Sequence, residues 1–157
     1  EFQTYIKNVL ANAKMLAETL KNNGFKIYSG GTDAHLMLVD LRPFNVKGNL
    51  ASESLSRANI TCNKNGIPFD TEKPMITSGI RLGSQAATTR GFGLKEFEKV
   101  GELITKVIKG LSENPEDNSK VENDVRNEVI NLCSNFPIYK NLNKWFALYA
   151  RKAKLQL

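Results

Sequence analysis

Cysteine and histidine are scarce in this sequence of 157 residues. It has two cysteines, Cys62 and Cys133, and one histidine, His35. The cysteines lie far apart and form no Cys-x-x-Cys pair, so the ligand spacing of a zinc site is missing. We therefore expect no metal site, and reduced thiols of the kind found in cytoplasmic proteins.

Long apolar runs are missing as well. No stretch of about 18 apolar residues occurs, so the sequence predicts no membrane-spanning helix. No charged-then-apolar leader opens the chain, and we expect no secretory signal. Glycine-rich phosphate loops of the P-loop or dinucleotide-binding type are also missing, as is a Ser/His/Asp set at a usable spacing.

Positive charge is in excess, but most of the excess lies at one end. The chain has 22 Lys and Arg against 16 Asp and Glu, a net charge of +6. Four cations and no acid fall in residues 141–157, and without them the surplus is two. Binding to nucleic acid needs phosphate contacts clustered on one basic face. We therefore expect no nucleic-acid binding; the alternative, a basic RNA-binding module, predicts an affinity that falls steeply with salt.

Three stretches carry apolar residues at the three- and four-residue steps typical of amphipathic helices: 2–22, 94–111 and 121–136. The first opens at Glu1 without an initiator methionine or a capping side chain. We interpret the chain as a fragment that begins within or just before a helix.

Shorter elements fill the space between these helices. The sequence predicts β-prone segments at 26–28, 35–41, 60–63 and 79–83, and a short helix at 49–58 with Leu50, Leu55 and Ala58 on its inner face. Residues 64–78 are polar and rich in turn residues, which favours an ordered loop.

These elements predict one α/β domain with a core, built as an α+β two-layer fold. A small antiparallel or mixed sheet of three or four strands would pack with helices, preceded by a long interdomain helix. We assign residues 1–22 to that helix, 23–140 to the small domain and 141–157 to an atypical basic tail.

Arg81 is the first candidate for binding a ligand. It stands between Gly79 and Gly83, which would leave space beside the guanidinium. Arginine suits a carboxylate because it donates two parallel hydrogen bonds. A structural ion pair is the alternative. Asn65 and the loop 68–74 would line a polar pocket, or Asn65 would form an Asn-Gly turn.

Two further polar residues have simple structural interpretations. His35 lies on an apolar strand, where a hydrogen-bonded structural histidine is expected rather than a base. Asp33 lies in a glycine-containing turn and predicts an Asx turn. From the residues alone, the chain is an α/β domain with a candidate carboxylate-binding arginine.

Four stretches combine into a specific pattern: Ser-Gly-Gly-Thr-Asp at 29–33, Arg-Ala-Asn-Ile-Thr-Cys-Asn-Lys-Asn at 57–65, Thr-Ser-Gly-Ile-Arg-Leu-Gly at 77–83 and Thr-Thr-Arg-Gly-Phe-Gly at 88–93. Over about residues 1–140 the chain resembles the C-terminal part of the serine hydroxymethyltransferase family. Its members interconvert serine and glycine and pass a one-carbon unit to tetrahydrofolate, with pyridoxal 5′-phosphate as electron sink. The resemblance implies one-carbon metabolism and glycine biosynthesis in the cytoplasm, by a homodimer or tetramer.

The resemblance also implies roles for individual residues. Arg81 would bind the carboxylate of the amino acid. The folate would contact Asn65, at its pterin ring, and Lys73, Pro74 and Met75. Three further positions would shape the site without reacting: Asp33, His35 and Arg90.

The family's larger N-terminal domain has no counterpart in this sequence. That domain carries the lysine that forms the Schiff base with pyridoxal phosphate and binds most of the cofactor. The resemblance therefore implies no catalytic residue in this chain and no activity of the chain alone. The alternative is a non-catalytic remnant or partner-binding module. Residues 141–157 match nothing in the family and would form a short amphipathic helix or an unstructured end.

Overall fold

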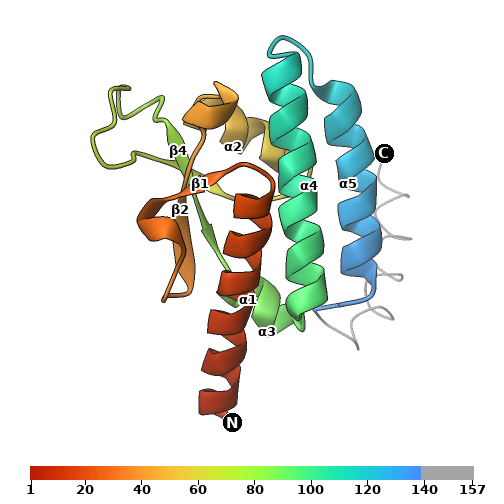
Figure 1. Ribbon diagram of the computed structural model, residues 1–157. Helices are drawn as coiled ribbons and strands as arrows, with labels where there is room; N and C mark the ends of the chain where they lie inside the picture. Colours follow the sequence, from red (N-terminus) through yellow and green to blue (C-terminus); the bar gives the residue numbers. More distant parts are fainter. Residues whose placement is uncertain (139–157) are drawn as a thin grey trace, which may run out of the picture.

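The computed structural model describes residues 1–138 (Figure 1). The expectations for the basic tail, residues 141–157, lie outside the described residues. In the described part, no helix is both long and apolar enough to cross a membrane.

A four-stranded antiparallel sheet forms one layer of the fold, in the order β1-β2-β4-β3. Its strands are β1 (Lys26–Ile27), β2 (Leu36–Asp40), β3 (Asn63–Asn65) and β4 (Gly79–Gly83). The helices are α1 (Phe2–Asn22), α2 (Gly48–Arg57), α3 (Gln85–Arg90), α4 (Leu94–Glu113) and α5 (Ser119–Ser134), with 3-10 turns at η1 (Tyr28–Gly30) and η2 (Arg42–Phe44). The predicted two-layer α/β fold is confirmed.

The helices lie on one side of the sheet. Helix α4 contacts α1, α2 and α5, and α5 is the element farthest from the sheet (Figure 1). The first turns of α1 extend beyond the other elements in the same view, and Phe2 is largely exposed there.

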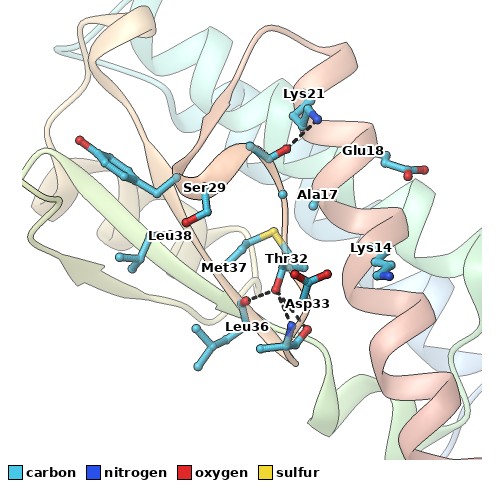
Figure 2. Close-up of a pocket in the computed structure, with 14 residues that line it drawn as sticks. Lys14, Ala17, Glu18, Lys21, Ser29, Thr32, Asp33, Leu36, Met37 and Leu38 are labelled. Carbon is cyan, nitrogen blue, oxygen red and sulfur yellow. Dashed lines mark hydrogen bonds between the residues drawn. The ribbon is translucent and has the colours of Figure 1, made fainter.

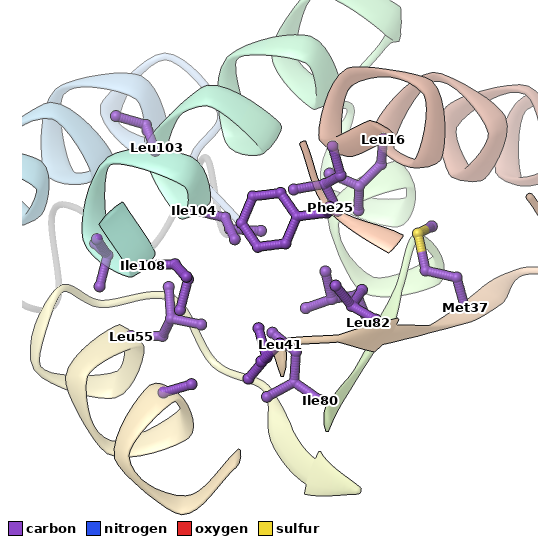
Figure 3. Packing of buried hydrophobic residues seen from close by; sticks show 14 of the residues in the cluster. Leu16, Phe25, Met37, Leu41, Leu55, Ile80, Leu82, Leu103, Ile104 and Ile108 are labelled. Carbon is purple, nitrogen blue, oxygen red and sulfur yellow. The ribbon is translucent and has the colours of Figure 1, made fainter. Parts of the chain in front are cut away.

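The core lies between the inner face of the sheet and helices α1, α2 and α4 (Figure 3). On the sheet, side chains alternate between faces, so Met37, Val39, Ile80 and Leu82 point into the core. Helix α4 contributes a largely apolar stripe: Phe97, Leu103, Ile104, Val107, Ile108 and Leu111. Burying each large apolar side chain stabilises the fold by about 1.5–3 kcal/mol, so this stripe is a main source of stability.

The predicted third strand begins three residues too early in the chain. The sequence predicts a strand at 60–63, whereas β3 spans Asn63–Asn65. Its polar residues show no apolar alternation, and the strand exists because it pairs with β4.

Two helical details also differ from expectation. Leu50 is exposed, and Ala51 takes the inner position beside Leu55. Helix α3, which the sequence did not predict, follows β4 directly.

Candidate functional site

Arg81 lies on the outer face of the sheet, away from the helices. In β4 its neighbours Ile80 and Leu82 are buried in the core, whereas Arg81 is exposed. Directly opposite it are Leu38 of β2 and Asn63 of β3. Opposed residues of antiparallel strands share a face, so an apolar and an amide side chain flank the guanidinium.

A cavity of about 520 Å³ surrounds this part of the sheet. Its lining residues come from β2, β3, β4 and the start of α3: His35, Leu36, Thr61, Cys62, Asn63, Arg81, Leu82, Gly83 and Gln85. The structure therefore brings together Arg81 and His35, two residues predicted for the site, although 45 residues of sequence separate them.

Arg81 has no carboxylate partner among residues 1–138. Other arginines show what a structural ion pair looks like in this fold. Arg42 donates to both carboxylate oxygens of Asp40, at 2.7–3.2 Å, and Arg57 donates to both oxygens of Glu122, at 2.7 Å. The structural-ion-pair alternative for Arg81 is thus wrong for the described residues, and its guanidinium is available to an external carboxylate.

Of the two glycines that flank Arg81, Gly79 is packed against its neighbours and does not keep space for a ligand, whereas Gly83 lines the cavity. A Cβ at Gly79 would lie 2.5 Å from Cγ2 of Ile67 and 2.7 Å from the carbonyl oxygen of Val39. A Cβ at Gly83 would lie 2.7 Å from Oε1 of Gln85. Glycine at 79 is therefore needed for close packing against the sheet and the loop.

Burial makes the cysteine of this cavity unreactive. It raises the pKa of the Cys62 thiol to about 11, so the thiol stays protonated at neutral pH. Among the described residues that line the cavity there is also no lysine. Among the described residues, the lining of this cavity therefore holds neither a reactive thiol nor a lysine amine.

Asn65 stands at the end of β3, opposite Gly79 and on the same face as Arg81. Its amide donates to the carbonyl of Gly66 at 2.7 Å. It ends a strand, so the predicted Asn-Gly turn is wrong.

The other residues expected at the folate lie in the loop of residues 66–78 between β3 and β4, which extends away from the helices (Figure 1). Lys73, Pro74 and Met75 are exposed there, with Met75 at 74%. None of the three lines the cavity around Arg81.

The start of α2 holds the second half of this loop. No side chain caps α2. Instead, the N–H groups of Gly48 and Asn49 donate to the carbonyls of Thr77 and Ile76, both at 2.9 Å. Free N–H groups at a helix start need such acceptors, so the helix and the loop satisfy each other.

Asp33 lies in a different cavity, of about 710 Å³, between α1 and residues 28–38 (Figure 2). The expected Asx turn does not form. The Thr32 hydroxyl closes this turn, because it accepts from the N–H of Ala34 at 3.0 Å and donates to the carbonyl of Leu36 at 2.7 Å.

Arg90 lies in a third cavity, of about 720 Å³, that includes residues from α3, α4 and α5. Its guanidinium donates to the carbonyls of Phe136, at 2.7 Å, and Cys133, at 3.1 Å. Arg90 thereby holds the end of α5.

His35 is exposed, and its imidazole has no hydrogen-bond partner among residues 1–138. The expectation of a hydrogen-bonded structural histidine is wrong. Of the three predicted site-shaping residues, His35 is the one that shares the cavity of Arg81.

Sequence reasoning missed Asn63 and Gln85, which also line this cavity. Correct placement of β3 would have found Asn63, because the register puts it opposite Arg81. Gln85 had no local signal, since its helix was not predicted.

Comparisons with a family model and with individual proteins point to the same family. The sequence model of the family described as serine hydroxymethyltransferase matches residues 1–104. The chain is 87% identical over 142 residues to a serine hydroxymethyltransferase of Pelagibacter ubique, which covers 90% of this chain and 33% of that protein. It is 64% identical over 140 residues to one of Marinomonas and 62% identical over 140 residues to one of Paramagnetospirillum magneticum, each covering 89% of this chain and 33% of the relative. The chain thus spans about a third of the length of these relatives.

Proposed function

Because the chain belongs to the serine hydroxymethyltransferase family, we propose that it is the C-terminal part of an enzyme that interconverts serine and glycine. The one-carbon unit passes to or from tetrahydrofolate. In this proposal the chain supplies the binding site for the amino-acid carboxylate and part of the folate site. The observation that carries the proposal is the exposed guanidinium of Arg81, free of any carboxylate in the described chain.

Arg81 binds the carboxylate of serine or glycine through two parallel hydrogen bonds. Such a contact restricts rotation of the amino acid and sets the direction of the bonds at its Cα. Arg81 lies on β4, which pairs with a strand on each side. Its backbone is therefore held rigidly in the sheet. Asn63 and His35, in the same cavity, supply polar groups around the bound carboxylate.

The folate site adjoins this face. Asn65 lies two residues along β3 from Asn63 and on the same side of the sheet, where its amide contacts the pterin ring. Lys73, Pro74 and Met75 project from the following loop. Their exposed apolar groups would cover the folate, and the Lys73 ammonium would favour a negatively charged ligand. Asp33 and Arg90 lie at a distance from Arg81: Asp33 lines the cavity beside α1, and Arg90 holds the end of α5.

Pyridoxal 5′-phosphate, when bound to the enzyme, withdraws electrons from the Cα of the amino acid. The residues of the Arg81 cavity do not fit this cofactor by themselves, because no lysine among the described residues lines it. In the proposal, another part of the enzyme holds the cofactor, and this chain holds the carboxylate end of the same amino acid.

The remaining features of the proposal follow from the family. The enzyme works as a homodimer or tetramer in the cytoplasm, in glycine biosynthesis and one-carbon metabolism, with no nucleic acid or membrane as partner.

A chimera tests the proposed function. In the Pelagibacter ubique enzyme, the stretch that matches this chain is replaced by the matching residues of this chain, which are 87% identical to it. The proposal predicts serine-to-glycine turnover within a few-fold of the parent enzyme. A folded, cofactor-loaded chimera without turnover would contradict it, and would favour the non-catalytic remnant.

A further inference from the structure

The loop of residues 66–78 buries little apolar surface: Ile67 is buried, and the start of α2 holds only the second half of the loop. The loop lies at the edge of the fold, and Pro68, Phe69, Pro74 and Met75 are all exposed. Phe69 is 97% exposed, so apolar burial does not hold its side chain. Something other than a local apolar core must order this loop.

The carboxylate of Asp70 does so from within the loop. Its Oδ1 accepts from the Ser78 hydroxyl at 2.7 Å and from the N–H of Glu72 at 3.0 Å. Its Oδ2 accepts from the N–H of Ser78 at 2.8 Å and from the N–H of Ile67 at 3.2 Å. One side chain thus connects the beginning, middle and end of the loop.

Two residues of the loop adopt a backbone conformation that side chains disfavour. Phe69 has φ 58° and Thr77 has φ 61°, both in the left-handed region. Bulky and β-branched residues occur there only when the surrounding structure imposes it. Each is next to a residue of the Asp70 network, Asp70 itself and Ser78, which identifies these hydrogen bonds as a source of the constraint.

Most of the support of Arg81 lies outside this network, which reaches β4 only at its start, through Ser78 and Ile67. Strand β4 pairs with β2 through five residues and with β3 through three, from Gly79 onward. Its inner residues, Ile80 and Leu82, are buried in the core. Loss of the Asp70 hydrogen bonds would therefore alter the loop and leave the position of Arg81 in place.

We infer that Asp70 is a positioning residue for the folate part of the site: its carboxylate holds the loop so that Lys73, Pro74 and Met75 meet the folate. Asp70 does not contact the substrate. The inference rests on the proposed function and adds to it a residue that separates folate binding from amino-acid binding.

The test uses the active chimera with Asp70→Asn and Ser78→Ala. Asparagine keeps one oxygen acceptor and loses the second, and Ser78→Ala removes one hydrogen bond of the network. We expect the KM for tetrahydrofolate to rise about tenfold in Asp70→Asn and about threefold in Ser78→Ala, because small displacements of contact groups are costly. The KM for serine should stay within about twofold of the parent. Asp70→Glu, which keeps both oxygens, should recover part of the loss.

Asp117→Asn is the matched control. Asp117 also accepts from a backbone N–H, that of Ser119 at 3.0 Å, but it lies between α4 and α5. We expect both KM values to be unchanged in this variant.

Three other results of these KM measurements would overturn the inference. Equal increases in the two KM values would show that Asp70 supports the whole domain, and unchanged values would show that the loop does not need it; either result overturns the inference while the proposed function stands. If Asp70→Asn fails to fold, the milder Ser78→Ala decides between the same results. An inactive parent chimera would overturn the proposed function and this inference with it.

Discussion

The carboxylate of Glu122, on α5, accepts two hydrogen bonds of 2.7 Å from the guanidinium of Arg57, at the end of α2. The Ser54 hydroxyl donates to the same carboxylate at 2.7 Å, and Glu122 is buried. This ion pair joins α5, the outermost helix, to the helix whose start anchors the loop of the site. A buried charge with three donors is costly to leave incomplete.

Replacement of Glu122 by alanine should therefore destabilise the domain. It leaves the buried Ser54 hydroxyl and the half-exposed Arg57 guanidinium without their shared acceptor, at a cost of about 1–3 kcal/mol in the free energy of unfolding. Urea unfolding of the chain measures this change. Glu98→Ala, at an exposed position of α4, is the control and should stay within about 0.5 kcal/mol. If Glu122→Ala lowered the free energy of unfolding no more than the control does, the stabilising role of the Glu122–Arg57 ion pair would be contradicted.

Gly48 lies too close to the loop to accept a side chain. A Cβ there would lie 2.1 Å from Oγ1 of Thr77 and 2.5 Å from the carbonyl oxygen of Gly79. Alanine favours a helix over glycine by at most about 1 kcal/mol, whereas overpacking costs about 1–3 kcal/mol. We expect Gly48→Ala to lower the free energy of unfolding. Gly66→Ala, with nothing nearer than 3.9 Å, is the control; an equal effect of both changes would contradict the close approach.

The stability that Asp70 provides should depend on pH. Burial by itself raises the pKa of Asp70, but the hydrogen bonds from Ser78, Glu72 and Ile67 lower it well below its usual range. A lowered pKa in the folded state stabilises the fold above the unfolded value, about 4, and this contribution is lost as the pH falls below it. The difference in the free energy of unfolding between the parent chain and Asp70→Asn should reach its maximum above about pH 5 and decrease below about pH 4. Urea titrations from pH 7 to pH 2 measure it; a constant difference would contradict the prediction.

The chain alone should show no serine–glycine exchange, because the described cavity around Arg81 holds no lysine for the cofactor. Incubation with pyridoxal phosphate, reduction with borohydride and peptide mass mapping measure whether one lysine takes up the cofactor. We expect only weak, scattered labelling. Stoichiometric label on a single lysine, together with turnover, would contradict this prediction.

The helices other than α3 could be predicted from the sequence because apolar periodicity is a local signal. The long stripe of α4 is the clearest example, and its predicted end, at residue 111, lies within two residues of the observed end at Glu113. Strand β3 could not be predicted in the same way. Asn63, Lys64 and Asn65 form a strand through pairing with β4, which is a contact between distant residues.

In the candidate site, too, features with a local sequence signal could be predicted and contacts between distant residues could not. Arg81 could be identified from its own strand, although Gly79, one of its two flanking glycines, serves close packing rather than ligand space. The proximity of Arg81 to His35 and Asn63 depends on the strand register, which no local sequence pattern encodes. The role of Asp70 was missed because its partners, from Ile67 to Ser78, become neighbours only when the loop is closed.

The central claim is that Arg81 binds the carboxylate of the amino acid, and the KM for serine of the chimera with Arg81→Lys tests it most directly. An ammonium cannot reproduce two parallel hydrogen bonds. We expect kcat/KM for serine to fall about 30- to 150-fold, equivalent to about 2–3 kcal/mol, with a raised KM for serine. Arg126→Lys, at an exposed position of α5, should leave both values unchanged. Near-normal kinetics of Arg81→Lys would contradict the account.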